Sequence, residues 1–448
     1  MTDIIWDREA AAHLLRRAGL PGPPDEVEAI SQLEREAAVD KLLLFGGIDN
    51  SELEAHLEGL DLDLTTYPGI LAEWVVRFVH TRRPFEERMA LFWHMHFATG
   101  IKKVISAPLM RAQIQMFREQ GRSRLDDLLL AVSRDPAMLV WLDNIHNHES
   151  APNENYAREL LELYSTGINT YTQEDVVEAA RAFTGWTIYR RFGTFAFVFN
   201  PRDHDYGSKT FLGEEGGWNG DDIIRIICEQ EVTPRFIAAK MWAHFGAGEA
   251  PAGLMDRMAE TYWISDHSLL EMFRTLFTDP DFYTAEQRRV RVKGPVEFTC
   301  GLLRQIKGKT TGEVLGALIA GQGLGLFDAP DPSGWKEGLS WITTATLLLR
   351  SQLASAVGLV REGALQVDLP GLLRDAGADT AEKAVTTLSN YLDLPEFSRH
   401  RREALAAYVI TNPFTGSSIP FDLDSGATLF KLAGLIQLLA ADPTYQVS

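Results

Sequence analysis

The sequence is poor in cysteine. Its 448 residues include only two, Cys228 and Cys300, and each lies in an apolar segment with helical spacing. Two isolated cysteines make neither a disulfide scaffold nor a zinc-ligand set. We therefore expect both to be buried thiols.

Other signals are also missing. No apolar run approaches the ~18 residues that a membrane-spanning helix requires, and residues 1–8 do not have the basic-then-apolar pattern of a signal peptide. We therefore expect a cytoplasmic protein without membrane insertion. The sequence has no Walker A motif and no Gly-x-Ser-x-Gly elbow, and no strand is predicted before the glycine run at 321–325, so a dinucleotide-binding fold is not expected.

Positive charge is also in short supply. The chain has 43 Lys and Arg against 62 Asp and Glu, a net charge of −19. This balance works against binding to a phosphate backbone, so we expect neither nucleic acid nor an anionic membrane as a partner. Hydrophobic residues make up 45 % of the chain and include ten Trp and 23 Phe, which is sufficient for a sizeable core.

The hydrophobic pattern predicts helices over most of the chain. Asp7 is a suitable N-cap for a first helix that Gly19 ends, and Thr172 with Asp175 forms a capping-box pattern. The period changes at 186–199, which predicts a β-hairpin, and 210–212 is a candidate third strand. We expect a mainly α, multi-helical single unit over 1–448, with a small β excursion near 186–212 and a softer boundary near 307–313.

One segment, Pro152–Leu163, combines an apolar and a strongly polar stripe. On a helix, Asn155, Arg158, Glu159 and Glu162 share a sector of about 100°. This stripe either faces water, as on an ordinary amphipathic helix, or faces the protein as part of a site.

Two other segments carry histidines beside polar groups. His94 and His96 resemble a metal chelate, but residues two apart on a helix point about 200° apart, so a core role for one of them is the alternative. The elbow after the hairpin places His204 beside Asp205 and Lys209. An imidazole beside a carboxylate can act as a base or a metal ligand, and a lysine can bind an anion.

Six segments together resemble the bacterial domain-of-unknown-function 1800 family. The most specific is the Asn-Glu-Asn-Tyr-Ala-Arg-Glu-Leu string at 153–160, followed by Thr-Gly-Trp at 184–186. The other segments lie at 13–19, 92–97, 204–209, and 293–298 with Gly334-Trp335. The resemblance covers residues 8–445, nearly the whole chain.

The resemblance implies no assigned activity. Members often look exported and are often encoded beside a protein that resembles alkaline-phosphatase-type hydrolases, so it implies such a partner. This chain departs from the pattern in having no recognised export signal and in having Ala329-Pro330-Asp331-Pro332 where a double proline is usual. The polar motif residues come from separate segments, which predicts that they converge on one pocket.

Two function hypotheses follow. One is a metal-assisted or acid/base hydrolase or transferase acting on an anionic small molecule or polymer; the other is a helical binding or scaffold protein with a buried polar network. The cofactor is unknown, and a divalent metal ion is one candidate. The predicted catalytic residues are Glu154, Arg158, Glu159, His204, Asp205 and Lys209. The predicted metal ligands are His94, His96, Glu159 and His204. The predicted substrate contacts are Asn153, Asn155, Glu162 and Trp186.

Overall fold

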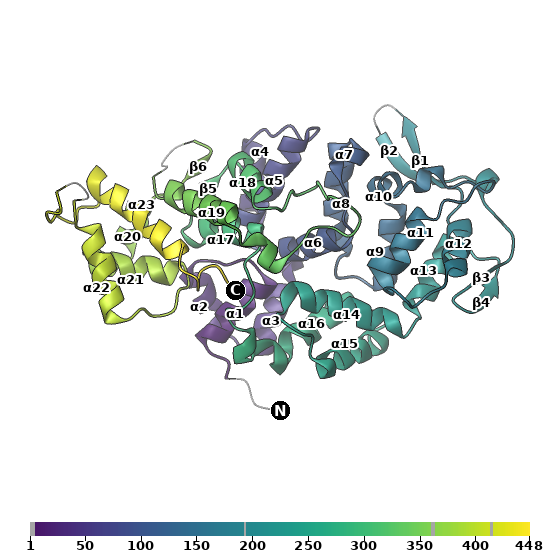
Figure 1. Cartoon of the computed structure of the whole chain (residues 1–448), viewed down its shortest axis with the longest axis horizontal. Coiled ribbons are helices and arrows are strands. Elements are labelled where there is room, and N and C mark those ends of the chain that lie inside the picture. Colours follow the sequence, from purple (N-terminus) through teal and green to yellow (C-terminus); the bar gives the residue numbers. More distant parts are fainter. Residues whose placement is uncertain (1–4, 192–193, 360–362, 413–414) are drawn as a thin grey trace.

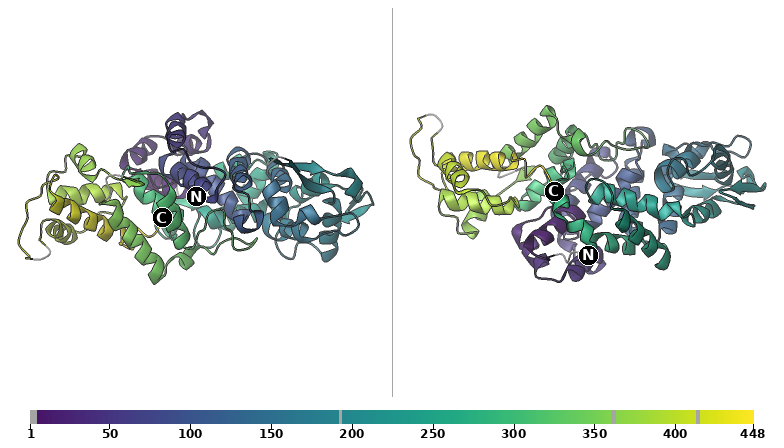
Figure 2. Two further views of the ribbon diagram at one scale, coloured as in Figure 1. Left: turned by 90° about the horizontal axis from the view of Figure 1, so that it is seen from above. Right: turned by 60° about the horizontal axis from the view of Figure 1, so that its bottom comes forward.

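Helices dominate the structure, a computed structural model that describes residues 5–191, 194–359, 363–412 and 415–448. The predicted mainly α class is confirmed. The molecule is elongated, with the β1–β2 hairpin at one end and helices α20–α23 at the other (Figure 1), and the further views in Figure 2 show the same long axis. Within the described ranges, no helix is long and apolar enough to cross a membrane.

The first helix, α1, begins and ends at the expected signals. The side chain of Asp7 accepts a hydrogen bond from the backbone N–H of Ala10, and α1 ends before Gly19. The N-terminal helices are α1 (Arg8–Ala18), α2 (Pro24–Ser31), α3 (Arg35–Leu43), α4 (Ser51–Gly59), α5 (Tyr67–His80), α6 (Pro84–His96), α7 (Ile101–Val104), α8 (Ala107–Gln120), α9 (Leu125–Arg134) and α10 (Pro136–Trp141).

The middle of the chain adds a second set of helices. The predicted capping box is confirmed, because the Thr172 side chain accepts from the backbone of Asp175 and the Asp175 carboxylate accepts from the backbone of Thr172. The elements are α11 (Asn155–Glu159), α12 (Gln173–Ala182), α13 (Gly220–Cys228), α14 (Val232–Phe245), α15 (Ala252–Ile264), α16 (Leu269–Thr278), α17 (Pro295–Gln305), α18 (Glu313–Gly321) and α19 (Thr344–Val357).

The last helices form the far end of the molecule in Figure 1. Helix α23 packs against both α19 and α22, which joins this end to the middle of the chain. The elements are α20 (Leu369–Asp375), α21 (Ala381–Tyr391), α22 (Arg399–Val409) and α23 (Gly426–Ala440).

Three small antiparallel sheets interrupt the helices in the described residues. The predicted hairpin is confirmed: β1 (Trp186–Arg191) pairs with β2 (Thr194–Phe199). The candidate third strand does not join it. Instead β3 (Lys209–Phe211) pairs with β4 (Glu214–Gly216), because Leu212 and Gly213 both have positive φ and form the type of tight turn that reverses a chain into a new hairpin. The third sheet pairs β5 (Lys309–Thr310) with β6 (Leu365–Gln366).

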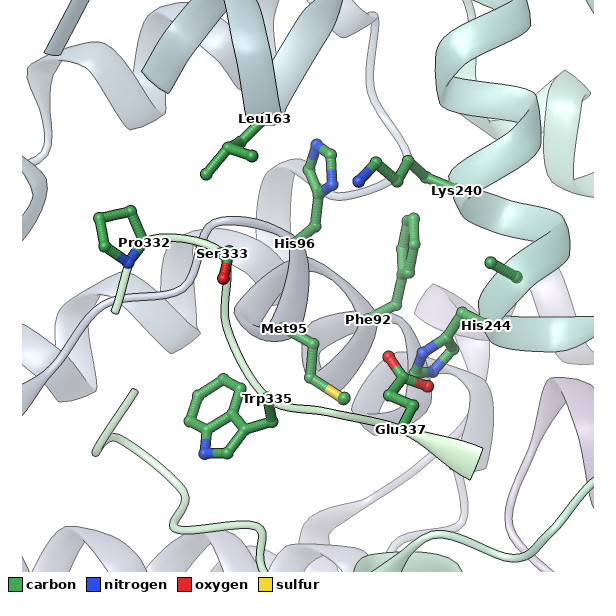
Figure 3. A pocket seen from close by; sticks show the side chains of 11 residues that line it. Phe92, Met95, His96, Leu163, Lys240, His244, Pro332, Ser333, Trp335 and Glu337 are labelled. Atoms are coloured by element: carbon green, nitrogen blue, oxygen red, sulfur yellow. The ribbon is translucent and has the colours of Figure 1, made fainter. Parts of the chain in front are cut away.

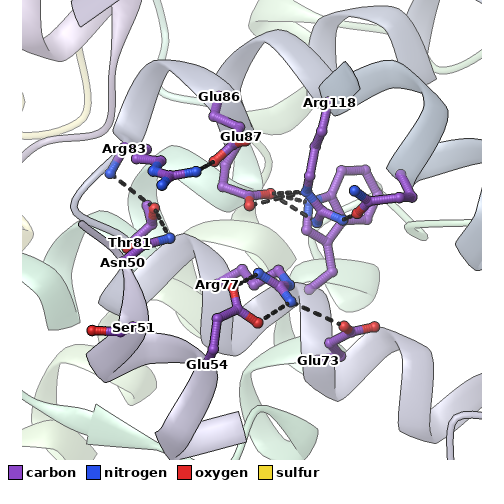
Figure 4. Close-up of polar contacts among 12 residues, drawn as sticks. Asn50, Ser51, Glu54, Glu73, Arg77, Thr81, Arg83, Glu86, Glu87 and Arg118 are labelled. Atoms are coloured by element: carbon purple, nitrogen blue, oxygen red, sulfur yellow. Dashed lines mark hydrogen bonds and ion pairs between the residues drawn. The ribbon is translucent and has the colours of Figure 1, made fainter. Parts of the chain in front are cut away.

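The core surrounds α6. Trp93 and Phe85 of this helix are fully buried, and both cysteines are buried as expected. Ion pairs lie beside this core: buried Arg118 binds buried Glu87, and Arg77 binds Glu54 nearer the surface (Figure 4). These ion pairs tie α4, α5, α6 and α8 together.

Candidate functional site

The polar segment at 152–163 is helical, but it begins later than expected and changes type. Helix α11 starts only at Asn155, and from Leu160 to Ser165 the chain forms a π-helix, η3. Short π-helical turns inside α-helices occur often at functional sites. Its last carbonyl groups have no partner within the helix and are free to accept hydrogen bonds from elsewhere.

One of these carbonyls orients a histidine. The carbonyl oxygen of Tyr164 lies 2.9 Å from Nε2 of His96, at the end of α6. Since a carbonyl only accepts, Nε2 carries the proton and Nδ1 of the neutral ring keeps its lone pair. The π-helix therefore fixes the tautomer of His96.

His96 lines a pocket of about 180 Å³ that four separate segments form, three of which contribute titratable side chains. Helix α6 contributes His96, α14 contributes Lys240 and His244, and the loop before α19 contributes Glu337. Figure 3 shows these side chains around one space, with the loop passing across it. The remaining wall is mainly apolar and consists of Phe92, Met95, Leu163, Ala243, Pro332, Ser333 and Trp335.

Both histidines of the pocket are held neutral. Burial, with a smaller effect from the charge of Lys240, lowers the pKa of His96 to about 3. Burial and the nearby guanidinium groups of Arg88 and Arg291 lower the pKa of His244 well below its usual value. Nε2 of His244 is buried and has no hydrogen-bond partner in the described part of the chain.

The other two groups are an amine and a carboxyl with opposite shifts. Burial lowers the pKa of Lys240 and raises the pKa of Glu337, although 36 % of the Glu337 side chain remains exposed. Lys240 forms no ion pair within the described ranges; its Nζ lies 5.0 Å from the centre of the Phe236 ring. Both shifts favour the neutral forms, because burial penalises the charged form of each group.

A buried ion-pair cluster lies behind the pocket. Arg291 binds both carboxylate oxygens of Glu297, at 2.8 and 2.9 Å, and Arg88 also binds Glu297. The second amino group of Arg291 lies 3.6 Å from Glu337. Burial alone would raise the pKa of Glu297, but the two guanidinium groups outweigh it and hold the pKa at about 2. Arg88, Arg291 and Lys240 are three cations, against the two carboxylates of Glu297 and Glu337. The local charge is therefore positive, although the chain as a whole is acidic.

The loop that covers the pocket is held in place by contacts with helix α6. Gly334 has φ +83°, and a Cβ there would lie 3.0 Å from the carbonyl oxygen of Met95. Nε2 of His94 accepts a hydrogen bond from the backbone N–H of Phe327 at 3.0 Å, and the His94 ring lies 5.1 Å from the ring of Trp335. His94 therefore positions the loop, and burial lowers its pKa to about 3.

Glu159 lies one helical turn before the pocket-lining Leu163, and Glu162 directly precedes it. Burial, with the like charges of Glu162 and Asp331, raises the pKa of Glu159. Glu162 accepts a hydrogen bond from the hydroxyl of Tyr171 at 3.2 Å. Since Asp331 belongs to the covering loop and Leu163 lines the pocket, this part of the predicted polar stripe adjoins the pocket.

The rest of the stripe makes a separate surface cluster. Arg158 binds Glu154 at 2.8 Å, and Gln173 of α12 bonds to both. The Arg158 and Glu154 side chains are 37 % and 39 % exposed. Neither side chain lines the pocket. Their exposure agrees with the first alternative for the stripe, a solvated face of an amphipathic helix.

Asn153, Asn155 and Trp186 take part in local structure. The carboxamide oxygen of Asn153 accepts a hydrogen bond from the backbone N–H of Asn155. The side-chain amide of Asn155 donates to the Leu142 carbonyl at 3.2 Å. Trp186 is buried, with Arg134 5.3 Å from its ring centre.

The elbow at 200–209 forms a third cluster, in which the polar groups are already partnered. Arg181 of α12 binds Asp205 at 2.7 Å, and Nδ1 of His204 bonds to the Thr184 carbonyl at 2.8 Å. Lys209 donates to the carbonyls of Asp205 and Gly207. Its side chain is buried, which lowers its pKa.

A family model described as "Protein of unknown function (DUF1800)" matches residues 13–447. The chain belongs to the DUF1800 family. No curated protein and no solved structure matches it. The resemblance read from the motifs is therefore confirmed over nearly the whole chain.

The expected metal ligands of this DUF1800 chain do not gather around one point. Across the described ranges, no group of three or more His, Cys, Asp or Glu side chains is placed to hold a metal ion. His94 and His96 bond to different backbone groups, and His204 bonds to a third. The metal-ligand prediction for His94, His96, Glu159 and His204 is not supported, because the described structure does not bring these side chains together in such a group.

Sequence reasoning missed most of the DUF1800 pocket. It identified His96 but not Lys240, His244 or Glu337. Lys240 and His244 are four residues apart, the spacing that puts two side chains on one helix face. This spacing was the only sequence signal for the pair, and it does not distinguish a site because it is common on helices.

Proposed function

We propose that this protein is an acid/base hydrolase or transferase that acts on a small anionic molecule in the pocket lined by His96, Lys240, His244 and Glu337. The observation that carries the proposal is the convergence of these four titratable side chains, from three distant segments, on one small pocket. Buried groups with shifted pKa values in a pocket are typical of functional sites.

Lys240 is the proposed anion-binding group. It has no carboxylate partner in the described ranges and stands near the positive cluster of Arg88 and Arg291. A bound carboxylate or phosphate would stabilise the charged form of Lys240, because an opposite charge raises a lysine pKa. The neutral His96 offers a lone pair at Nδ1 for a substrate hydroxyl.

Glu337 is the proposed proton donor and acceptor. Its raised pKa keeps a fraction of the carboxyl protonated closer to neutral pH than an ordinary glutamate. In the acid form it would protonate a leaving group, and in the base form it would take a proton from water or from an acceptor hydroxyl. Glu159, also with a raised pKa, lies outside the pocket lining.

The test uses p-nitrophenyl phosphate as the anionic probe substrate and the neutral ester p-nitrophenyl acetate as its comparison. Glu337→Gln should lower kcat by about 100-fold or more, the usual contribution of general acid/base catalysis, while the exposed Glu260→Gln leaves it unchanged. Lys240→Gln should raise KM for the phosphate ester, with Lys336→Gln as the matched control. Wild-type rates in Glu337→Gln, or a wild-type protein that neither turns over nor binds either probe, would contradict the proposal.

A second candidate is a non-enzymatic binding or scaffold role, which the family resemblance would pair with a protein like the alkaline-phosphatase superfamily. The buried Arg88–Glu297–Arg291 cluster favours it, since such networks also fix a structure in one conformation. In this case Lys240→Gln and Glu337→Gln would change neither turnover nor anion binding.

A further inference from the structure

A second pocket, of about 250 Å³, lies where α1, α2 and α3 meet the start of α6. Its interior is lined by Leu15, Ile30 and Leu42, each at most 6 % exposed. The volume is below the ~300–1,000 Å³ of sites for drug-sized ligands. An apolar interior of this size suits a short hydrocarbon chain.

The rim of this pocket is cationic. Four basic side chains line it, Lys41, Arg82, Arg83 and Arg304, against one acidic side chain, Glu26. Such a rim is unusual in a chain with a net charge of −19.

Two of these cations are already committed. Arg304 is buried and binds both carboxylate oxygens of Glu26, at 2.8 and 3.0 Å. Arg83 donates to the Ile48 carbonyl at 2.7 Å. It also lies 3.8 Å from Glu86, and Figure 4 shows this ion pair. These two arginines therefore hold the walls of the pocket in place.

The other two are free. Neither Lys41 nor Arg82 forms a side-chain hydrogen bond or ion pair with the residues that the structure describes, and both are exposed. Asp49 lies close enough to Arg82 to feel its charge, yet its carboxylate accepts hydrogen bonds from Ser51. Two unpaired cations thus stand at the mouth of an apolar pocket.

We propose that this pocket binds a medium-chain aliphatic carboxylate such as octanoate. The alkyl chain would lie against Leu15, Ile30 and Leu42, and the carboxylate would sit between Lys41 and Arg82. Apolar burial would supply most of the affinity, and the two cations would select a carboxylate over a neutral head group. This site is separate from the pocket at Lys240.

The direct test is calorimetric titration of the full chain with octanoate and 1-octanol. Octanoate should bind at a saturable site, and 1-octanol about tenfold more weakly because it lacks the carboxylate. A lack of saturable octanoate binding to the wild-type protein would overturn the inference. So would equal affinity for octanoate and octanol.

Variants locate the site. Ala29 lines the pocket from an exposed position on α2, so Ala29→Phe should fill it and weaken octanoate binding about tenfold or more while the protein stays folded. The double variant Lys41→Gln, Arg82→Gln should remove the preference for octanoate over octanol. The control, Lys383→Gln with Arg399→Gln on α21 and α22, makes the same charge change far along the chain and should preserve it.

Two further outcomes would count against the site. Unchanged octanoate affinity in Ala29→Phe would overturn the placement in this pocket. A loss in Lys240→Gln, with none in the Lys41, Arg82 double variant, would assign octanoate to the other pocket and would equally overturn the inference.

Discussion

Two polar regions of this molecule differ in whether their polar groups are already used. In the elbow at 200–209, Asp205 is paired with Arg181, and Lys209 donates to two backbone carbonyls. In the pocket, Lys240 has no ion pair among the described residues, and Nε2 of His244 is buried without a hydrogen-bond partner. The elbow holds structure together, whereas the pocket has free capacity for a ligand.

The comparison shows why residue type alone is a poor guide to a site. Both regions contain a histidine, a lysine and a carboxylate, and burial lowers the pKa of both lysines. The two regions differ in whether these side chains already have hydrogen-bond or ion-pair partners within the protein. A group whose hydrogen bonds are satisfied within the fold gains little from a ligand, whereas an unsatisfied one gains much.

The largest expected effect is at the ion-pair cluster behind the pocket. Glu297→Gln should lower the free energy of unfolding by about 3–5 kcal/mol, because it leaves Arg88 and Arg291 buried beside an uncharged group. Urea unfolding followed by circular dichroism measures this, with Glu260→Gln as the exposed control. A loss below about 1 kcal/mol, the range of surface pairs, would show that the cluster is not a stabilising feature.

Acid should act through the same carboxylate. The pKa of Glu297 is about 2 in the folded protein, below the ordinary 4.5. Because the pKa is lowered on folding, ionised Glu297 contributes its full stabilisation above the pKa that it has in the unfolded chain. This contribution to the free energy of unfolding, about 3 kcal/mol, is lost as the pH falls from about 5 to 2. Unfolding free energies over this range, in the wild type and Glu297→Gln, should diverge as pH rises. Parallel curves would contradict the assignment.

A smaller loss is expected in the elbow. Lys209→Gln should cost about 1–3 kcal/mol, because the carbonyls of Asp205 and Gly207 lose a buried charged donor. Anion binding should be unchanged. Chemical denaturation and calorimetry on the same variant test both statements, and a stable Lys209→Gln protein that no longer binds anions would move the site to the elbow.

The smallest effect is expected on the exposed stripe. Arg158→Ala should cost at most about 1 kcal/mol, since its pair with Glu154 is more than one-third exposed on both sides and surface pairs contribute little. Thermal unfolding of this variant beside Gln173→Ala checks the prediction. A loss of several kcal/mol would restore the reading of Arg158 as part of a buried structural network.

Much of the fold was predictable because its signals are local. Asp7, Thr172 and Asp175 cap helices through bonds that span three residues, and the 186–199 hairpin follows from a change in hydrophobic period. The β3–β4 hairpin was missed because it depends on positive φ at Leu212, which a leucine seldom adopts.

The site was predicted only in part because its residues meet through tertiary structure. His96 was named from its motif, but its role depends on the carbonyl of Tyr164 in a π-helix. Nothing near Lys240 or Glu337 in the sequence indicates that α14 and the loop after Gly334 face the same space. Glu154, Arg158, Asp205 and Lys209 looked equally suitable, since the sequence does not reveal which polar groups already have partners.

The most direct test of the central claim compares the two lysines. Calorimetry should measure binding of inorganic phosphate and of acetate to the wild type, Lys240→Gln and Lys209→Gln. We expect Lys240→Gln to weaken the binding about tenfold or more, the value of one charged hydrogen bond, and Lys209→Gln to leave it unchanged. Equal affinities in the wild type and Lys240→Gln, or a loss confined to Lys209→Gln, would contradict it.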